Sequence, residues 1–183
     1  SETLSFRLTA LARDADAQQD TLDDDRLYVA PALTWTPTSR TSVTLLAQVQ
    51  KDVAGSPMGL PLAGTLNPNA LGEVPEDRYL GEPDFDSSDS LFATVGYEAR
   101  HEFASGWEFR QNAQYVWLDF DYRNLYFGSL SADGRTVNRG ASVQTEEYRQ
   151  LGLDTQVAGT VSTGPLSHEL LFGVDSRLIH DDR

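Results

Sequence analysis

The sequence predicts an all-β protein, an antiparallel meander of about seven strands. Apolar and polar residues alternate in stretches of strand length, and the connections between these stretches run long and short in turn. No stretch approaches the ~20 consecutive apolar residues that a membrane-spanning helix needs. Short turns at one end and long loops at the other are typical of outer-membrane β-barrels. Transport or surface binding is therefore favoured over catalysis.

Each expected strand is defined by residues that alternate between two unlike faces, with a period of two. In the second strand Pro31 removes a ladder donor, which a central strand accommodates only at a bulge. In the third strand Leu46 is the one breach of alternation. The expected strands, in order, are residues 4–10, 27–35, 43–50, 91–103, 107–122, 150–161 and 166–178. The expected connections are residues 12–25, 36–40, 52–90, 104–106, 123–144 and 162–165.

Composition narrows the function classes. The chain has 14 Lys+Arg against 28 Asp+Glu and a net charge of -14, which opposes binding to nucleic acid because that affinity comes largely from neutralising phosphates. The absence of Cys excludes a disulfide framework and a thiolate metal site. A length of 183 residues would suffice for one soluble domain, so length does not decide the class. No basic region followed by an apolar core marks a secretion signal at the start.

The connection 52–90 is the longest one expected. Gly and Pro are scattered through it, and a structureless segment of this length is uncommon inside a compact domain. It is expected of an external loop on a barrel.

Aromatic residues support the same orientation. Trp35, Phe103 and Trp107 lie beside the short turns, where a girdle of amphipathic rings is expected at one membrane surface. Tyr115 and Trp117 come later in their strand and are expected nearer the other surface. The alternative is that these rings form the core of a β-sandwich.

Seven strands cannot close a transmembrane barrel, because the smallest bacterial examples have about eight strands and plugged transporters have about 22. An open edge in lipid would leave unpaired amides at a cost of several kcal/mol each. We therefore expect residues 1–183 to be a partial barrel domain, a fragment of a larger transmembrane barrel.

The residues resemble those of TonB-dependent siderophore receptors, in particular the ferric hydroxamate (ferrichrome-type) branch. The resemblance runs in order through nearly the whole chain. The stretches that carry it are DRLYVAPALTW (25–35), GLP (59–61) followed by GT (64–65), RYLGEPDF (78–85), VGYE (95–98), HEF (101–103), RQN (110–112), DTQ (154–156) and GVD (173–175).

The resemblance implies a 22-stranded barrel around an N-terminal plug in the outer membrane of a Gram-negative bacterium. It implies uptake of a ferric siderophore, with energy passed through the TonB complex to the plug, which is absent here, as are the remaining strands. No cofactor is implied, since Fe³⁺ arrives as a siderophore chelate. The barrel surface would contact outer-membrane lipid.

The resemblance also implies ligand-binding residues. Tyr126, at the start of the expected loop after the fifth strand, matches an aromatic position of the family's external pocket, and Phe127 lies beside it. Tyr79 and Phe85 are candidates for further rings. The aromatic residues that the family places in the preceding loop are not matched in residues 55–61, so the resemblance supports the siderophore class without singling out ferrichrome.

Catalytic and metal chemistry find little support, and we expect no enzyme activity and no metal ligand. His101, His168 and His180 lack zinc-site spacing, and the run of three Asp at 23–25 lacks the spacing and Gly of a calcium loop. We expect a different role for a set of charged side chains near the short turns, namely a wet lumen wall against which a plug docks. Its members are Glu98, Arg100, Glu102, Glu108 and Arg110. Solubilising residues on one sheet face are the alternative.

Two other functions stay open at this point. The first is a soluble secreted β-sandwich that binds or cleaves glycans, with rings stacked on sugars. The second is a passive porin, which the resemblance disfavours.

Overall fold

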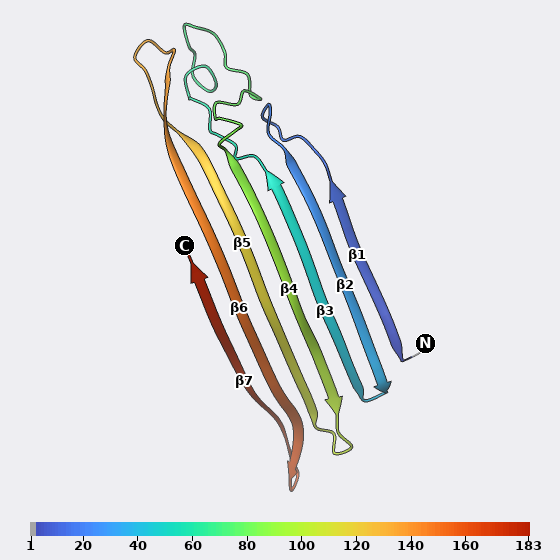
Figure 1. The fold of residues 1–183 in the computed structure, drawn as a ribbon. Coiled ribbons are helices and arrows are strands. Elements are labelled where there is room, and N and C mark those ends of the chain that lie inside the picture. The colour runs from blue at the N-terminus through green and yellow to red at the C-terminus, as the bar shows by residue number, and fades with distance from the viewer. Residues whose placement is uncertain (1–2) are drawn as a thin grey trace.

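The computed structural model describes residues 3–183 as one antiparallel sheet of seven strands in chain order (Figure 1). The strands are β1 (Leu4–Arg13), β2 (Asp24–Thr38), β3 (Thr41–Ala54), β4 (Ser87–Glu102), β5 (Glu108–Leu130), β6 (Val137–Thr163) and β7 (Leu166–Asp182). The predicted meander is confirmed. Across residues 3–183, no helix has both the length and the apolar character needed to cross a membrane.

The two ends of the sheet differ, as the sequence predicts. Tight turns join β2 to β3, β4 to β5 and β6 to β7 at the lower end of Figure 1. Gly106 and Gly164 take positive φ values of 80° and 62° in two of these turns, a conformation that glycine adopts without a steric penalty. The connections 14–23 and 55–86 lie together at the other end. We call the two ends the turn end and the loop end.

The prediction of a second long loop at residues 123–144 is wrong. β5 continues to Leu130 and β6 begins at Val137, so that only residues 131–136 form the turn. Cross-strand pairing runs unbroken from Arg123↔Val143 to Phe127↔Arg139. β4 pairs with β5 only as far as Ser87↔Arg123, so this hairpin projects past the rest of the sheet. Residues 123–130 do not alternate apolar with polar, because this hairpin projects past the sheet and packs in part against the loop 55–86.

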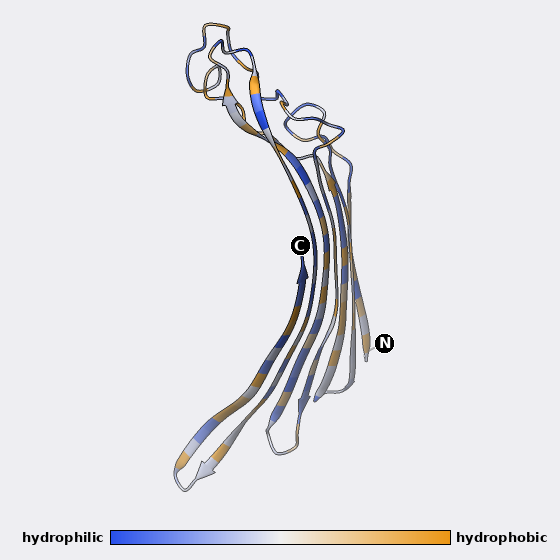
Figure 2. Ribbon diagram, turned by 60° about the vertical axis from the view of Figure 1, so that its left-hand side comes forward, coloured by the Kyte–Doolittle hydropathy of each residue, from blue (hydrophilic) through white to orange (hydrophobic). Residues whose placement is uncertain are grey.

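The sheet is a single layer, so the β-sandwich alternative is not observed. Val95 is 57%, Leu153 40% and Phe172 61% exposed, and in Figure 2 hydrophobic and hydrophilic residues alternate along the strands. Among residues 3–183 the buried apolar side chains are those of Leu22, Met58 and Pro61, and all three lie in the loops. An apolar face without a protein partner belongs against hydrocarbon.

Up to the register shifts at Trp35/Thr38 and Phe127/Ser129, cross-strand pairing assigns the strand residues to two faces. The lipid face carries the odd-numbered residues of β2 to β6, including Val95, Tyr115 and Leu153, and the even-numbered residues of β1 and β7. The lumen face carries the residues in between. Pro31 lies within β2 opposite Leu8 of β1, and the β2–β3 ladder lacks pairs between Val29↔Val49 and Ala32↔Leu46. The missing proline donor is thus accommodated by a local gap in pairing.

Candidate functional site

The five predicted plug-facing residues all lie on the lumen face, near the turn end. Arg100 is opposite Arg110, and Glu102 is opposite Glu108, across the β4–β5 ladder. The guanidinium of Arg100 donates to Glu108 Oε2 at 2.7 Å, and Arg110 also donates to the Glu108 carboxylate. Glu108 therefore separates two like charges that would otherwise repel each other across the strands.

A shallow hollow crosses the lumen face above these charges. It has a volume of about 500 Å³ and its lining includes Gly96, Gly152, Glu98 and Asp154. Neither glycine contributes a side chain to the lumen face, so the surface is lowest there. A Cβ on Gly152 would lie no nearer than 3.8 Å to the side chains and strands around it. The packing of the sheet therefore does not require a glycine at this position.

An aromatic band lies on the lumen face nearer the loop end. We define it as the rings of Phe92, Phe120, Tyr122 and Tyr148 together with Leu118, which lies between Phe92 and Tyr148; β4, β5 and β6 bring these residues together in adjacent cross-strand rows. The Phe120 and Tyr122 rings stack, with centroids 5.8 Å apart and planes 14° apart. The Tyr148 hydroxyl donates to Gln150 Oε1 at 2.6 Å.

Sequence reasoning missed the aromatic band as a site. The sequence did contain a signal for this band, because aromatic rings occupy positions of β5 at which the alternation predicts polar lumen residues. The dense run of aromatic residues on both faces of this strand hid the pattern.

Tyr126 is not in a loop but inside β5, and it follows the aromatic band outward on the same face. The residue is 52% exposed, and its ring lies across Gly140 of β6, where a Cβ would overlap the ring. Phe127 points to the opposite face, where it pairs with Arg139. The structure thus brings Tyr126, but not Phe127, into line with Tyr122.

Tyr79 and Phe85 lie in the loop 55–86, outside the strands. The Tyr79 hydroxyl donates to the Asp86 carboxylate. Burial, and next the hydrogen bond to Asp86, raise the pKa of Tyr79, so the phenol stays protonated as a donor. Phe85 is half-buried in the turn before β4, where its N–H donates to Glu82 O at 2.9 Å.

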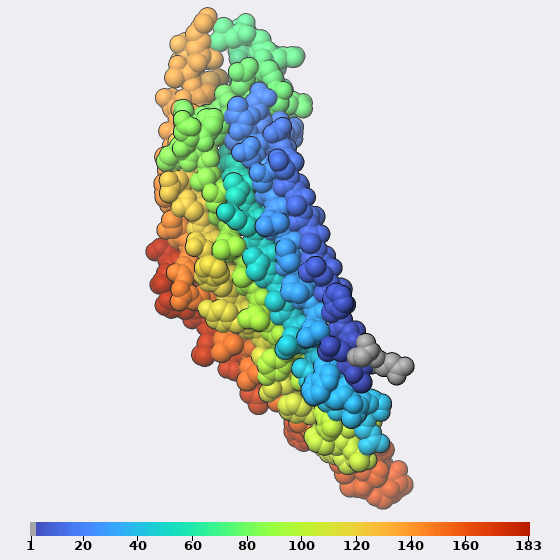
Figure 3. Space-filling model, turned by 45° about the vertical axis from the view of Figure 1, so that its right-hand side comes forward, coloured from blue at the N-terminus to red at the C-terminus, as the bar shows by residue number. Residues whose placement is uncertain are grey.

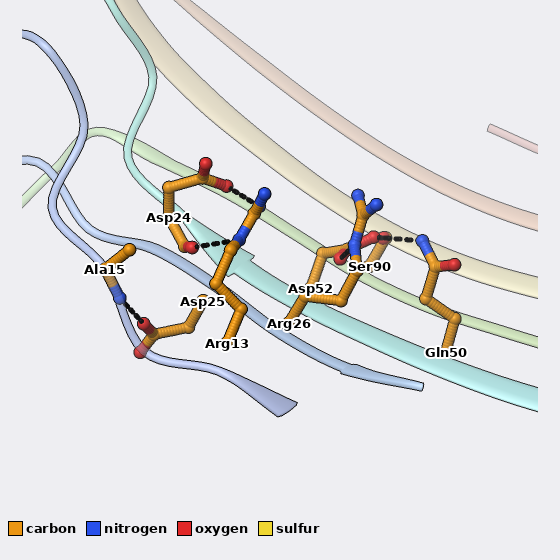
Figure 4. A network of polar contacts seen from close by, with 8 residues as sticks. All are labelled: Arg13, Ala15, Asp24, Asp25, Arg26, Gln50, Asp52 and Ser90. Carbon is orange, nitrogen blue, oxygen red and sulfur yellow. Dashed lines mark hydrogen bonds and ion pairs between the residues drawn. The ribbon is translucent and has the colours of Figure 1, made fainter. Parts of the chain in front are cut away.

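A polar network crosses the first four strands at the loop end (Figure 4). Asp52 of β3 accepts from Arg26 at 2.5 Å, from Gln50 at 2.7 Å and from Ser90 at 3.4 Å. Nearby, Arg13 donates to the Asp24 carbonyl at 2.9 Å, and Asp25 accepts from the Ala15 N–H at 3.1 Å. The acidic residues Asp24 and Asp25 thus hold the strand ends together.

A small core ties the two longest loops to the sheet. Gln19 of the connection 14–23 donates to Met58 O at 2.8 Å and accepts from Met58 N at 3.0 Å. Ser56, which is 1% exposed, donates to the Tyr122 hydroxyl at 3.1 Å. The loop core therefore reaches the aromatic band directly.

The three histidines are far apart and each has a local partner. His101 contacts Thr41 and the Phe103 ring, His168 contacts Thr163, and His180 contacts Asp182. Among residues 3–183, His, Asp and Glu side chains nowhere gather in a group of three that could hold a metal ion.

The chain is similar in sequence to known receptors. It is 35% identical over 176 residues to the ferrioxamine B receptor of Salmonella typhimurium (strain SL1344), covering 96% of this chain and 25% of that receptor. It is 31% identical to the ferrioxamine receptor of Yersinia enterocolitica, covering 96% and 24%. It is 30% identical to the ferrichrome outer membrane transporter/phage receptor of Escherichia coli (strain K12), covering 97% and 26%. No family model matches.

Solved structures show the same fold. The ferric-catecholate import receptor of E. coli K12 superposes with a TM-score of 0.83 at 20% identity, over 99% of this chain and 30% of that chain. The ferripyoverdine receptor of Pseudomonas aeruginosa superposes with a TM-score of 0.79 at 19% identity, over 98% and 24%. The chain spans about a quarter of the length of the curated relatives it matches.

The seven-stranded sheet has the fold of part of a large receptor β-barrel, and its relatives in sequence are named as receptors and as an outer membrane transporter. More closely, the chain is a homologue of the TonB-dependent siderophore receptors, as the sequence resemblance predicted. The relatives are receptors and transporters, and their place in the Gram-negative outer membrane confirms the predicted location.

Proposed function

We propose that this chain forms part of the barrel of a receptor for TonB-dependent uptake of ferric siderophores, with hydroxamate-like chelates as the ligand class. The observation that supports this best is the similarity over 96% of the chain to a ferrioxamine B receptor, joined to a sheet with one exposed apolar face. Fe³⁺ is held by the chelate's own oxygen atoms, so the protein needs surfaces that contact the chelate but no metal ligands.

In this proposal the chelate contacts the lumen side of the loop end. Tyr126 and the aromatic band form a nearly continuous apolar strip on β5, and rings contact an organic chelate over large areas with little loss of side-chain entropy. Phe127, Tyr79 and Phe85 stay in the proposed ligand-binding set. Phe127 lies on the opposite face of the hairpin, and Tyr79 and Phe85 lie in the loop 55–86, so these three would contact the chelate outside the lumen strip.

The charged wall of the lumen face is the proposed contact for the plug. Arg100 and Arg110 are 59% and 54% exposed, although both pair with Glu108, so each guanidinium keeps donors free for a partner in the lumen. With Glu98 and Glu102 beside them, the wall offers both signs of charge to a polar plug. The plug would in turn receive energy from the TonB complex, and outer-membrane lipid would cover the lipid face.

Uptake by the full-length receptor tests the proposal. The gene is expressed in a strain lacking its own siderophore receptors, and uptake of ⁵⁵Fe-loaded trihydroxamate chelate is measured with and without functional TonB. We expect saturable uptake that requires TonB. A ⁵⁵Fe-loaded catecholate chelate is the matched control for ligand class. Equal uptake of both chelates would contradict hydroxamate-like chelates as the ligand class. Uptake without functional TonB would contradict TonB-dependent transport.

A further inference from the structure

Asp86 is a buried carboxylate at the root of the loop 55–86, immediately before β4. The residue is 6% exposed. Its Oδ2 accepts from the Glu82 N–H at 2.8 Å and from the Tyr79 hydroxyl, and its Oδ1 accepts from the Leu125 N–H of β5 at 2.6 Å. A buried charge is tolerated when donors surround it in this way.

The bond to Leu125 replaces a missing backbone partner. β4 and β5 pair for the last time at Ser87↔Arg123, so the N–H of Leu125 lies beyond the end of the β4 ladder. The Asp86 side chain supplies the acceptor that a longer β4 would have supplied. It thereby attaches the loop to β5 at the residue next to Tyr126.

A second attachment comes from the other strand of the hairpin. Arg139 of β6 donates to Leu80 O at 2.7 Å, to Gly81 O at 3.0 Å and to the Glu82 carboxylate at 2.6 Å. Residues 79–86 are therefore held to both strands of the hairpin. Figures 1 and 3 show the loop (green) and the hairpin tip (orange) side by side at the loop end.

We propose that Asp86 is a positioning residue for ligand binding, which holds residues 79–86 and the outer part of β5 together as one preformed wall. The inference rests on the proposed function and deepens it. The wall stands in place before the chelate arrives and does not close over it. The entropy cost of ordering residues 79–86 is then met during folding. A preformed surface binds more tightly than one that must become ordered on binding.

The test uses the full-length receptor in membranes, with spin labels at Glu76 in the loop and Ala132 at the hairpin tip. The distance between the labels is measured by double electron–electron resonance, with and without ferric trihydroxamate. Asp86→Ala is compared with Asp84→Asn, an exposed acid in the same turn. We expect one narrow distance in the wild type and in Asp84→Asn, unchanged by chelate, and a broad distribution in Asp86→Ala.

Uptake kinetics provide the second readout. Asp86→Ala is expected to raise the KM for uptake about tenfold, the equivalent of roughly one lost hydrogen bond to a charged group, while the maximal rate stays near the wild-type value. A general folding defect would lower the maximal rate instead. If Asp86→Ala does not reach the membrane, Arg139→Gln breaks the second attachment and is expected to broaden the same distance.

Two results would overturn the preformed wall. One is a wild-type distance that shifts when chelate is added, and the other is a distance and KM in Asp86→Ala that match the wild type. The distance without chelate reports on the attachment even if the receptor binds another ligand class. Failure of chelate binding in the wild type would instead count against the proposed function.

Discussion

The rings of Phe120 and Tyr122 stack on the lumen face of β5, 5.8 Å between centroids and 14° between planes. They are two residues apart on one strand, so their side chains leave the backbone in the same direction. The Ser56 hydroxyl fixes the Tyr122 hydroxyl from the loop core. A flat aromatic surface thus stands on a face that carries mostly polar residues, and this surface is the proposed place for an organic chelate.

The first prediction concerns that pair. Phe120→Ala and Tyr122→Ala should each weaken chelate binding by roughly 1.5–3 kcal/mol, the scale of burying one large apolar side chain. Binding is measured by quenching of intrinsic fluorescence in the purified full-length receptor. Because the rings touch, the double variant should lose less than the sum of the two single losses. Asp119→Asn, on the lipid face of the same strand, is the control and should bind normally. Normal binding by both alanine variants would remove the aromatic band from the site.

The second prediction concerns Gly140. A Cβ there would overlap the Tyr126 ring, so Gly140→Ala should turn the ring away while the hairpin keeps its pairing. Chelate affinity in Gly140→Ala should fall to that of Tyr126→Ala, and the double variant should be no weaker than either one. Ser142→Ala, exposed on the same face of β6, is the control. Additive losses would show that Gly140 acts independently of Tyr126.

The third prediction uses the two faces of β4. Val95→Arg places a charge on the lipid face, where arginine near the bilayer midplane costs roughly 2–4 kcal/mol. Thr94→Arg places the same side chain on the lumen face and should cost much less. The free energy of unfolding of the full-length receptor is measured in lipid vesicles by urea titration. Equal losses in the two variants would mean that the faces are assigned wrongly.

The fourth prediction follows from the raised pKa of Tyr79. Burial is the main cause and the hydrogen bond to Asp86 the second. The folded loop holds the phenol in its protonated form. The contribution of this phenol to the stability of the folded loop is therefore fully present below the ordinary tyrosine pKa of about 10, and it is lost as the pH rises through the raised pKa. The label distance between Glu76 and Ala132 should stay narrow up to about pH 10. In Tyr79→Phe the distance distribution should no longer broaden at alkaline pH through ionisation of this phenol. A wild-type distribution that already broadens between neutral pH and pH 9 would contradict the raised pKa of Tyr79.

Much of the fold could be predicted from the sequence because the membrane imposes a simple rule on each strand. Val95 and Leu153 lie between small or polar neighbours, and together with Phe172 they are exposed on the apolar face as expected. The tight turns were located by Gly106 and Gly164, whose positive φ values other residues rarely adopt.

The alternation of apolar and polar residues ends where the strands project past the rest of the sheet, and the prediction from sequence was wrong there. Residues 123–130 and 137–144 project past the rest of the sheet and contact the loop 55–86, so their strands lack alternation and were predicted as loop. Asp86 also went unnoticed, because the bond from the Leu125 N–H depends on where β4 stops relative to β5. Such a relation between distant residues is set by register and leaves no local pattern.

A nitroxide scan along β4 tests the assignment of faces most directly. Single labels are placed at positions 91–100 of the full-length receptor in bilayers, and collision rates with oxygen and with a water-soluble nickel complex are measured. We predict a period of two, with the label at Val95 accessible to oxygen and those at Thr94 and Gly96 accessible to the nickel complex. A label at Val95 that neither reagent reaches, or a scan without alternation, would contradict a lipid-facing strand.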